Sequence, residues 1–185
     1  MSLNKGHLTA NRDTQSDEMY TPYYAAEPIV KYINPALTVW CPFDKEWSAY
    51  VRMFSKNGNQ VIATHIDDGQ DFFTYEPEHY DVIISNPPFS KKDAVLKRLY
   101  ELNKPFAVLL PLNSLQGKGR FEIFKQGGAQ MLVFDSRCGF HNPVSIDKTV
   151  ENTPFACAYF CRGLLPCDLI FEQLKRYKKP LEVQS

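Results

Sequence analysis

The sequence predicts an α/β protein: a mostly parallel sheet of about seven strands, with helices on both faces and an antiparallel hairpin at one edge. Three observations lead to this class. Short apolar runs alternate with segments of helical periodicity over most of the chain. The segment DVIIS at 81–85 holds an uninterrupted apolar run, as in a parallel strand covered on both faces. The apolar runs at 131–135 and 155–160 follow each other without a clear helical segment between them, which predicts the antiparallel pair.

The individual elements follow from local signals. Thr21-Pro22 starts a helix that stops before Asn34-Pro35, Gly58 is placed as a C-cap glycine, and Ser90 as an N-cap. Strands are expected over residues 37–41, 60–66, 71–75, 81–85, 106–111, 131–135 and 155–160. Helical segments are expected over residues 22–33, 45–56, 91–103, 116–128 and 168–177. Residues 1–20 are polar and are expected to form a flexible arm before a single domain at 21–185.

Composition excludes several classes of protein. The 185 residues include 21 basic and 21 acidic side chains, so the net charge is zero. This balance argues against a protein that binds nucleic acid over its whole surface. The aromatic fraction of 14% excludes a disordered chain. No apolar run is long enough for a membrane span or a signal peptide, so we expect a cytoplasmic protein with no membrane partner. Five cysteines and four histidines lack metal-ligand spacing, which predicts reduced thiols and no metal.

The residues that indicate chemistry are Asn86, Pro87, Pro88 and Phe89, between the apolar run and a helix. The prolines fix φ and lack an N–H, so they make a stiff lip rich in hydrogen-bond acceptors. The Asn86 amide oxygen and the Pro87 carbonyl can accept both hydrogens of a ring-bound amine, while Phe89 stacks on the ring. Drawing this nitrogen toward tetrahedral geometry would point its lone pair at an electrophile. A Pro-Pro turn of purely structural role is the alternative interpretation.

The segment DVIISNPPFS resembles the catalytic motif of S-adenosylmethionine-dependent amino methyltransferases, above all the DNA adenine-N6 methyltransferases. The resemblance runs from about Thr21 to Phe160 and is similar to the small phage and prophage type with gamma-like motif order. It implies a Rossmann-like class I methyltransferase fold, S-adenosylmethionine as cofactor, and DNA with a flipped adenine as substrate. It also implies that Thr21 and Pro22 help to hold the methionine end of the cofactor. Asp71 would face the cofactor's adenine amine, and Phe72 would form its apolar wall.

The loop after the first strand departs from this family. The family pattern is Asp-Pro-x-x-Gly-x-Gly, whereas this chain reads CPFDKEW at 41–47, so only Pro42 matches. The acid that ends the family's second strand aligns with His65. Asp44 and Asp67 are close enough in sequence to substitute for the missing acids, with Asp44 at the methionine end. Lys45 and Trp47 replace glycines, so we expect a narrowed pocket and weak cofactor binding.

Charge and aromatic residues suggest where a polyanion would lie. Residues 86–125 contain eight lysines and arginines against three acids. Lys91, Lys118 and Arg120 are therefore candidates for contact with DNA phosphates, against the alternative of an ordinary solvated basic face. Phe140 and Phe155 are candidates to flank the flipped base, although aromatic residues at strand starts are more often core.

Two other functions remain open from the sequence. One is methylation of another planar amine or amide, such as an RNA base or a protein glutamine; Phe89 favours a nucleobase, because glutamine-directed relatives usually carry tyrosine there. The other is a non-catalytic binding protein on the same fold, which the altered glycine loop supports. Only about 25 residues follow Phe160, too few for a separate recognition domain. A homodimer, a partner protein or low sequence specificity would each be compatible with the lack of a separate recognition domain.

Overall fold

The computed structural model describes residues 19–142, 145–150, 153–179 and 181. Most of the predicted N-terminal arm, residues 1–18, lies outside the described residues. Seven strands form one sheet in the order β2-β1-β3-β4-β8-β5-β9, and β6 and β7 form a separate hairpin. The strands of the sheet are β1 Thr38–Cys41, β2 Gln60–Ala63, β3 Val82–Ser85, β4 Phe106–Pro111, β5 Gln130–Phe134, β8 Cys157–Arg162 and β9 Leu169–Glu172. The hairpin strands are β6 Phe140–Asn142 and β7 Ser145–Val150.

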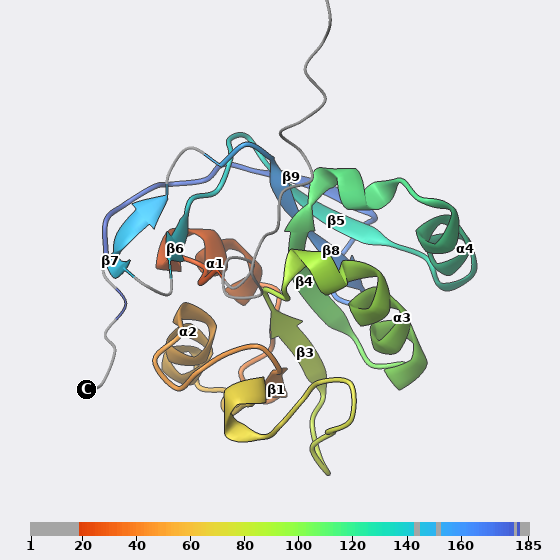
Figure 1. Ribbon diagram of the computed structural model, residues 1–185, viewed down its shortest axis with the longest axis horizontal. Coiled ribbons are helices and arrows are strands. Elements are labelled where there is room, and N and C mark those ends of the chain that lie inside the picture. Colours follow the sequence, from red (N-terminus) through yellow and green to blue (C-terminus); the bar gives the residue numbers. More distant parts are fainter. Residues whose placement is uncertain (1–18, 143–144, 151–152, 180, 182–185) are drawn as a thin grey trace, which may run out of the picture.

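Helices cover both faces of this sheet (Figure 1). They are α1 Tyr23–Val30, α2 Ala49–Asn57, α3 Lys92–Leu102 and α4 Lys118–Gly127. The pair α1 and α2 lies on one face, and the pair α3 and α4 lies on the other (Figure 1). Two separate clusters of buried side chains result, one beneath each helix pair. The strongest predicted strand, β3, is buried at all four positions, as expected for a strand between two helical layers.

The predicted fold class is confirmed: an α/β protein with a seven-stranded, mostly parallel sheet and an antiparallel pair. Strands β1 to β4 pair in parallel, so their carboxyl ends share one edge of the sheet. Strand β8 runs antiparallel to both of its neighbours, β4 and β5, and β9 extends the sheet beyond β5. The carboxyl ends of parallel strands are where α/β proteins bind ligands, which is the property of this fold that matters below.

Two predicted elements are wrong. Residues 71–75, predicted as a strand, form a turn, because the Asp71 carboxylate accepts the Phe73 N–H at 3.0 Å and the Asp71 carbonyl accepts the Thr74 and Tyr75 N–H groups. Residues 168–177, predicted as a helix, instead contain β9. The open edge of β5 offers backbone partners there, and this tertiary pairing overrides local helix propensity.

Several predicted boundaries also shift. Pro22 is the N-cap of α1 and not its first residue, and α1 ends at Val30. The second helix begins only at Ala49, after the cap Ser48. Ser90 is not a cap: a 3₁₀ turn over Phe89–Lys91 precedes α3. Likewise β2 is shorter than expected, and β8 begins two residues later than expected, so Phe155 precedes β8 and does not open it.

Gly58 offers a test of the predicted helix cap. It ends α2 with φ of 98° and its N–H donates to the last turn, as the sequence predicts. We expect Gly58→Ala to lower the free energy of unfolding by about 1 kcal/mol, because a Cβ is strained at this φ. Urea denaturation measures the change. Gly119→Ala in α4 is the control, because its added Cβ meets no atom within 4 Å and no loss of stability is expected. An equal loss of unfolding free energy in both variants would contradict the role of Gly58 as a helix cap.

Candidate functional site

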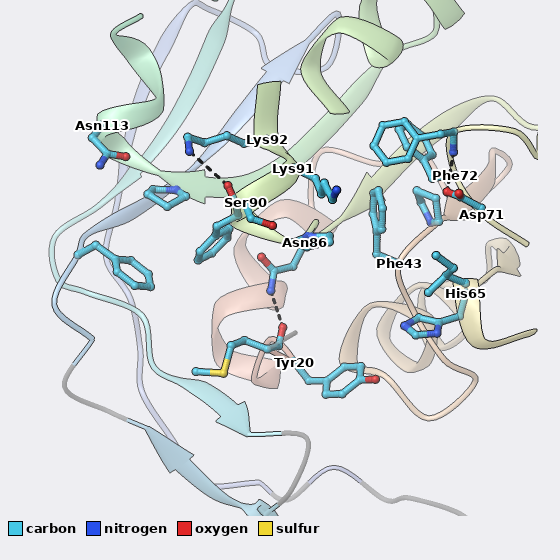
Figure 2. A pocket seen from close by; sticks show the side chains of 18 residues that line it. Tyr20, Phe43, His65, Asp71, Phe72, Asn86, Ser90, Lys91, Lys92 and Asn113 are labelled. Atoms are coloured by element: carbon cyan, nitrogen blue, oxygen red, sulfur yellow. Dashed lines mark hydrogen bonds between the residues drawn. The ribbon is translucent and has the colours of Figure 1, made fainter. Parts of the chain in front are cut away.

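The carboxyl ends of the parallel strands surround a cavity of about 790 Å³. Its lining comes from the segments that follow β1, β2, β3 and β4, from the segment before β8, and from the chain that precedes α1. The lining residues are Met19, Tyr20, Pro42, Phe43, His65, Ile66, Asp71, Phe72, Phe73, Asn86, Pro88, Phe89, Ser90, Lys91, Lys92, Pro111, Asn113 and Phe155. Figure 2 shows Asn86 between an aromatic side at Phe43 and Phe72 and a more polar side at Lys92 and Asn113.

Asn86 follows β3 directly, and its side chain has a defined orientation. Its Nδ2 donates to the Met19 carbonyl at 2.7 Å (Figure 2). Because a carbonyl only accepts, this bond places Oδ1 on the other side of the amide. Oδ1 is buried and has no hydrogen-bond partner among the residues that the structure describes. A buried acceptor without a partner costs free energy, so Asn86 Oδ1 is held ready for a donor from a ligand.

The rest of the lip is also held in place. Pro88 and Phe89 line the cavity, whereas Pro87 is buried and does not. The Phe89 carbonyl accepts from Lys92 Nζ at 3.3 Å, which anchors the lip to the start of α3. The segment therefore places the Asn86 side chain and the Phe89 ring at the cavity from a stiff backbone.

The two predicted aromatic candidates gather around Phe89. The Phe89 ring meets the Phe155 ring at 5.4 Å and the Phe140 ring at 5.9 Å, both edge to face. Phe155 is half-buried and lines the cavity, while Phe140 is fully buried behind it. Phe155 is thus placed to contact a ligand, and Phe140 supports the other two rings.

At the other end of the cavity the structure brings Asp71 and Phe72 together with Phe43. The rings of Phe43 and Phe72 are 4.9 Å apart, and Phe72 is almost fully buried against Trp40. Asp71 uses Oδ1 to accept the Phe73 N–H, which leaves Oδ2 as the atom available to an incoming amine. An aromatic wall beside one carboxylate oxygen suits an adenine ring and its amino group.

Pro42 and His65 line the same end of the cavity, after β1 and β2 respectively. The backbone N–H of Asp67 donates to His65 Nδ1 at 3.2 Å, which fixes the ring orientation. His65 is buried and occupies the position where the family carries an acid. Its imidazole, and not a carboxylate, therefore borders this end of the cavity.

Three predicted cofactor residues do not line the cavity. Thr21 and Pro22 are buried, and the Pro22 carbonyl accepts from Ala25 and Ala26 N–H at the start of α1. Asp67 is exposed and accepts from Lys45 Nζ at 2.9 Å, and that lysine holds the pKa of Asp67 below its usual range. These side chains shape or flank the site, and none faces its interior.

Asp44 also differs from its predicted place at the methionine end. It is buried beneath the lip, where its Oδ2 accepts from the Ser85 hydroxyl at 2.5 Å, and it does not line the cavity. Its backbone N–H donates to the Thr64 carbonyl, which turns this loop inward. Burial raises the pKa of Asp44 to about 6, against the opposing effect of hydrogen bonds from Ser85 and Ser48.

The altered glycine loop does not narrow the cavity as expected. Lys45 turns toward Asp67 and Asp68, and the Trp47 ring packs against the Tyr20 ring at 4.5 Å. Neither Lys45 nor Trp47 lines the cavity. The bulky residues are accommodated outside it because the neighbouring segments supply an ion pair and an aromatic contact.

The basic residues do not form one continuous face. Lys91 and Lys92 line the cavity, and Lys118 is exposed at the start of α4. The Arg120 guanidinium binds the Asp93 carboxylate and the Gln116 carbonyl, so its charge is already paired within the protein. Lys104 lies near the start of β1, in a second, smaller pocket with Thr38.

The sequence interpretation missed the contribution of Met19 and Tyr20. They were assigned to the arm, yet Tyr20 is buried and exchanges two backbone hydrogen bonds with His141 of β6, at 2.8 and 3.0 Å. The hydrophobic pair Met19-Tyr20 ahead of Thr21 was the available signal. Asn113, after β4, was likewise not identified as a cavity residue.

Within the part of the chain that the structure describes, no helix is long and apolar enough to cross a bilayer. The same residues contain no group of three or more histidine, cysteine, aspartate or glutamate side chains that could hold a metal ion. All five cysteines are unpaired, and only Cys167 is exposed.

Comparisons with known proteins indicate the fold. No protein-family model matches the sequence, and no curated protein matches it significantly. A solved structure described as the modification subunit of a type I restriction enzyme from Vibrio vulnificus YJ016 is similar, with a TM-score of 0.52 and 13% identity over 89% of this chain and 49% of that one. The type I restriction-modification methyltransferase subunit from Streptococcus thermophilus has a TM-score of 0.49 and 14% identity over 88% of this chain and 48% of that one.

This chain spans about half the length of those two subunits. The strand order, the antiparallel β8 and the likeness to the Vibrio vulnificus subunit show a Rossmann-like fold of the class I methyltransferase type. The cavity lies where this class of α/β sheet binds its ligands.

Proposed function

We propose that this protein transfers a methyl group from S-adenosylmethionine to an exocyclic amine, specifically N6 of adenine in DNA. The observation that carries the proposal is Asn86 Oδ1, a buried acceptor without a partner at the end of β3 beside a large cavity. An amide whose oxygen is reserved in this way requires a ligand donor, and an aromatic amine supplies one.

The residues of the chain would act by position and not by acid–base chemistry. S-adenosylmethionine, when bound, supplies a methyl group on positively charged sulfur as the electrophile. Asn86 Oδ1 accepts one hydrogen of the amine, and the Met19 carbonyl keeps this amide from rotating. Phe89 and Phe155 bound the ring on its apolar side. Holding the nitrogen in this geometry directs its lone pair toward the methyl group.

The other end of the cavity fits the cofactor. Asp71 Oδ2 would accept the adenine amine of the cofactor, and Phe72 with Phe43 would form the apolar wall. His65 would border the ribose. A cavity of about 790 Å³ is within the range of small-molecule sites.

Two features favour a nucleobase in DNA. Phe89 supplies a flat apolar face, and Lys91 and Lys92 place positive charge at the cavity where phosphates would lie. The described relative from Vibrio vulnificus is named as a modification subunit of a restriction enzyme, which agrees with a DNA substrate. A base stacked in a duplex cannot reach Asn86, so the target would be flipped or single-stranded.

The direct test is mass spectrometry of nucleosides after incubation with S-adenosylmethionine and either duplex or single-stranded DNA. We expect N6-methyladenine, formed faster on single strands. Methylation of RNA or of a protein, but not of DNA, would contradict the proposed substrate and support the methyltransferase activity. No methylated product on any of these, although the cofactor binds, would contradict the proposal.

Salt dependence tests the assignment of the basic residues. We expect Lys91→Ala to weaken DNA binding and to reduce the slope of log affinity against log salt by about 1, because one phosphate contact is lost. Arg120→Ala should leave this slope unchanged, since its guanidinium is already bound to Asp93 and Gln116. Fluorescence anisotropy over a salt series measures both. Equal slopes for Lys91→Ala and the parent protein would remove Lys91 from the DNA-binding surface.

A further inference from the structure

Asp44 is a buried titratable group that the proposed chemistry does not use. It lies in the loop after β1, and its carboxylate joins that loop to the last residue of β3, because Ser85 Oγ donates to Asp44 Oδ2 at 2.5 Å. Ser85 is fully buried and directly precedes Asn86. Asp44 is tied in turn to the end of β2, since its N–H donates to the Thr64 carbonyl. One residue therefore links the ends of three neighbouring strands, to β3 through its side chain and to β2 through its backbone.

The position of this link matters because the lip has little other support from below. Pro87 and Pro88 have no N–H to bond to the sheet, so the backbone after Ser85 has fewer anchors than an ordinary loop. The bonds that hold the lip include the Asn86 bond to Met19 and the Lys92 bond to the Phe89 carbonyl, both made by residues that line the cavity, and the bond from the Lys91 N–H to the Pro88 carbonyl. The Asp44–Ser85 bond is the counterpart beneath it.

Burying a carboxylate also costs free energy that an apolar side chain would not. Asp44 is fully buried, and burial raises its pKa to about 6. Three titratable groups interact electrostatically with Asp44. They are Cys41 at the end of β1, Tyr50 in α2 and His65 after β2. Since burial of this carboxylate is unfavourable for stability and the bond from Ser85 offsets only part of the cost, the location of Asp44 at the base of the lip indicates a role in geometry.

We propose that Asp44 is a positioning residue of the lip: through Ser85 its carboxylate sets the orientation in which Asn86 presents Oδ1 to the substrate amine. This inference rests on the proposed methyl transfer for its catalytic consequence, but the coupling between Asp44 and Asn86 exists whether or not the protein is an enzyme. Asp44 therefore affects the turnover of bound substrate and not the affinity for the cofactor.

A double-mutant cycle tests the catalytic consequence. Asp44→Asn and Ser85→Ala are each expected to lower kcat by about 10- to 100-fold, and the double variant by no more than the larger single effect, because both remove the same link. Calorimetry with S-adenosylhomocysteine should give a Kd within about twofold of the parent in each, because Asp44 lies outside the cavity. Asp68→Asn, an exposed acid on the neighbouring turn, is the control and should have the parent kcat.

Two outcomes of the cycle would overturn the proposal. Additive losses in the double variant would show that Asp44 and Ser85 act separately. A raised Kd for S-adenosylhomocysteine with unchanged kcat would make Asp44 a cofactor ligand, as the sequence first suggested.

A measurement on the parent protein separates this proposal from the proposed function and does not depend on a variant that folds. The side-chain amide resonances of Asn86, assigned by their loss in Asn86→Ala, should move as the pH is lowered through about 6, when Asp44 takes up a proton. They should stay in place in Asp44→Asn. Resonances that do not move, or that move equally in Asp44→Asn because of a group such as the facing His65, would overturn the coupling. Absent methyl transfer with the coupling intact would instead contradict the proposed function alone.

Discussion

Replacing Asn86 by alanine is expected to abolish methyl transfer, with a loss of at least about 10³-fold in kcat, comparable to removing a preorganised polar group elsewhere. The side chain is the buried acceptor of the cavity, and its loss removes the bond that directs the amine lone pair. Folding should be almost unaffected, because the hydrogen bond that is lost joins the half-buried Asn86 to the half-buried Met19. Single-turnover assays measure the chemistry, and circular dichroism measures the fold.

Asn86→Asp makes this prediction sharper. A carboxylate keeps an acceptor toward the cavity but cannot donate to the Met19 carbonyl, so two acceptors would face each other at 2.7 Å. We therefore expect Asn86→Asp to lose activity as well, although it preserves size and shape. Gln126→Ala, which removes an exposed amide on α4, is the control and should behave like the parent. Asn86→Ala with parental activity would refute the assignment of the lip.

Replacing Asp71 is expected to have the largest effect on cofactor binding. In Asp71→Asn the oxygen can still accept the Phe73 N–H and keep the turn, but the second oxygen becomes an NH₂ group. That donor would face the adenine amine, so we expect the Kd of S-adenosylhomocysteine to rise by about 10- to 100-fold, the worth of a hydrogen bond to a charged group. Calorimetry measures the change.

Asp71→Ala serves as the comparison, because it removes both the turn and the acceptor. If both variants bind as weakly as each other while Asp71→Asn keeps the parental melting temperature, the contact with the cofactor is the cause. Unchanged cofactor binding in both variants would show that the cofactor's adenine does not contact Asp71 and binds elsewhere in the cavity. Parent protein that gives no heat with millimolar cofactor in the presence of DNA would favour the non-catalytic interpretation of the fold.

Local sequence signals were sufficient for the elements that depend on neighbouring residues. The uninterrupted apolar run predicted β3, and the prolines after it predicted a stiff lip at its carboxyl end. Gly58 was predicted as a helix cap because φ near 98° is available mainly to glycine. Parallel strands place their carboxyl ends at one edge, so the proximity of Asn86 and Pro42 followed from the order of the elements, whereas the place of Asp71 was expected from the family resemblance.

The tertiary structure decided what depends on partners distant in sequence. Residues 169–172 form β9 because β5 has an open edge, and residues 71–75 form a turn because the Asp71 carboxylate accepts a nearby N–H. The sequence likewise does not show whether Asp44, the acid near the first strand, faces a cofactor or the Ser85 hydroxyl. Asp44 lies 41 positions from Ser85, and Met19 lies 67 positions from Asn86, yet both contacts position the lip.

The chain sequence by itself thus determined the α/β class and the acceptor-rich lip, because apolar periodicity and proline geometry act within a few residues. Only the tertiary structure decided how Asn86 is oriented and which acids reach the cavity. The physical reason is that a hydrogen bond depends on distance and direction to within a few tenths of an ångström. Such precision arises when the strand ends, α1 and the segment at Met19 and Tyr20 pack together.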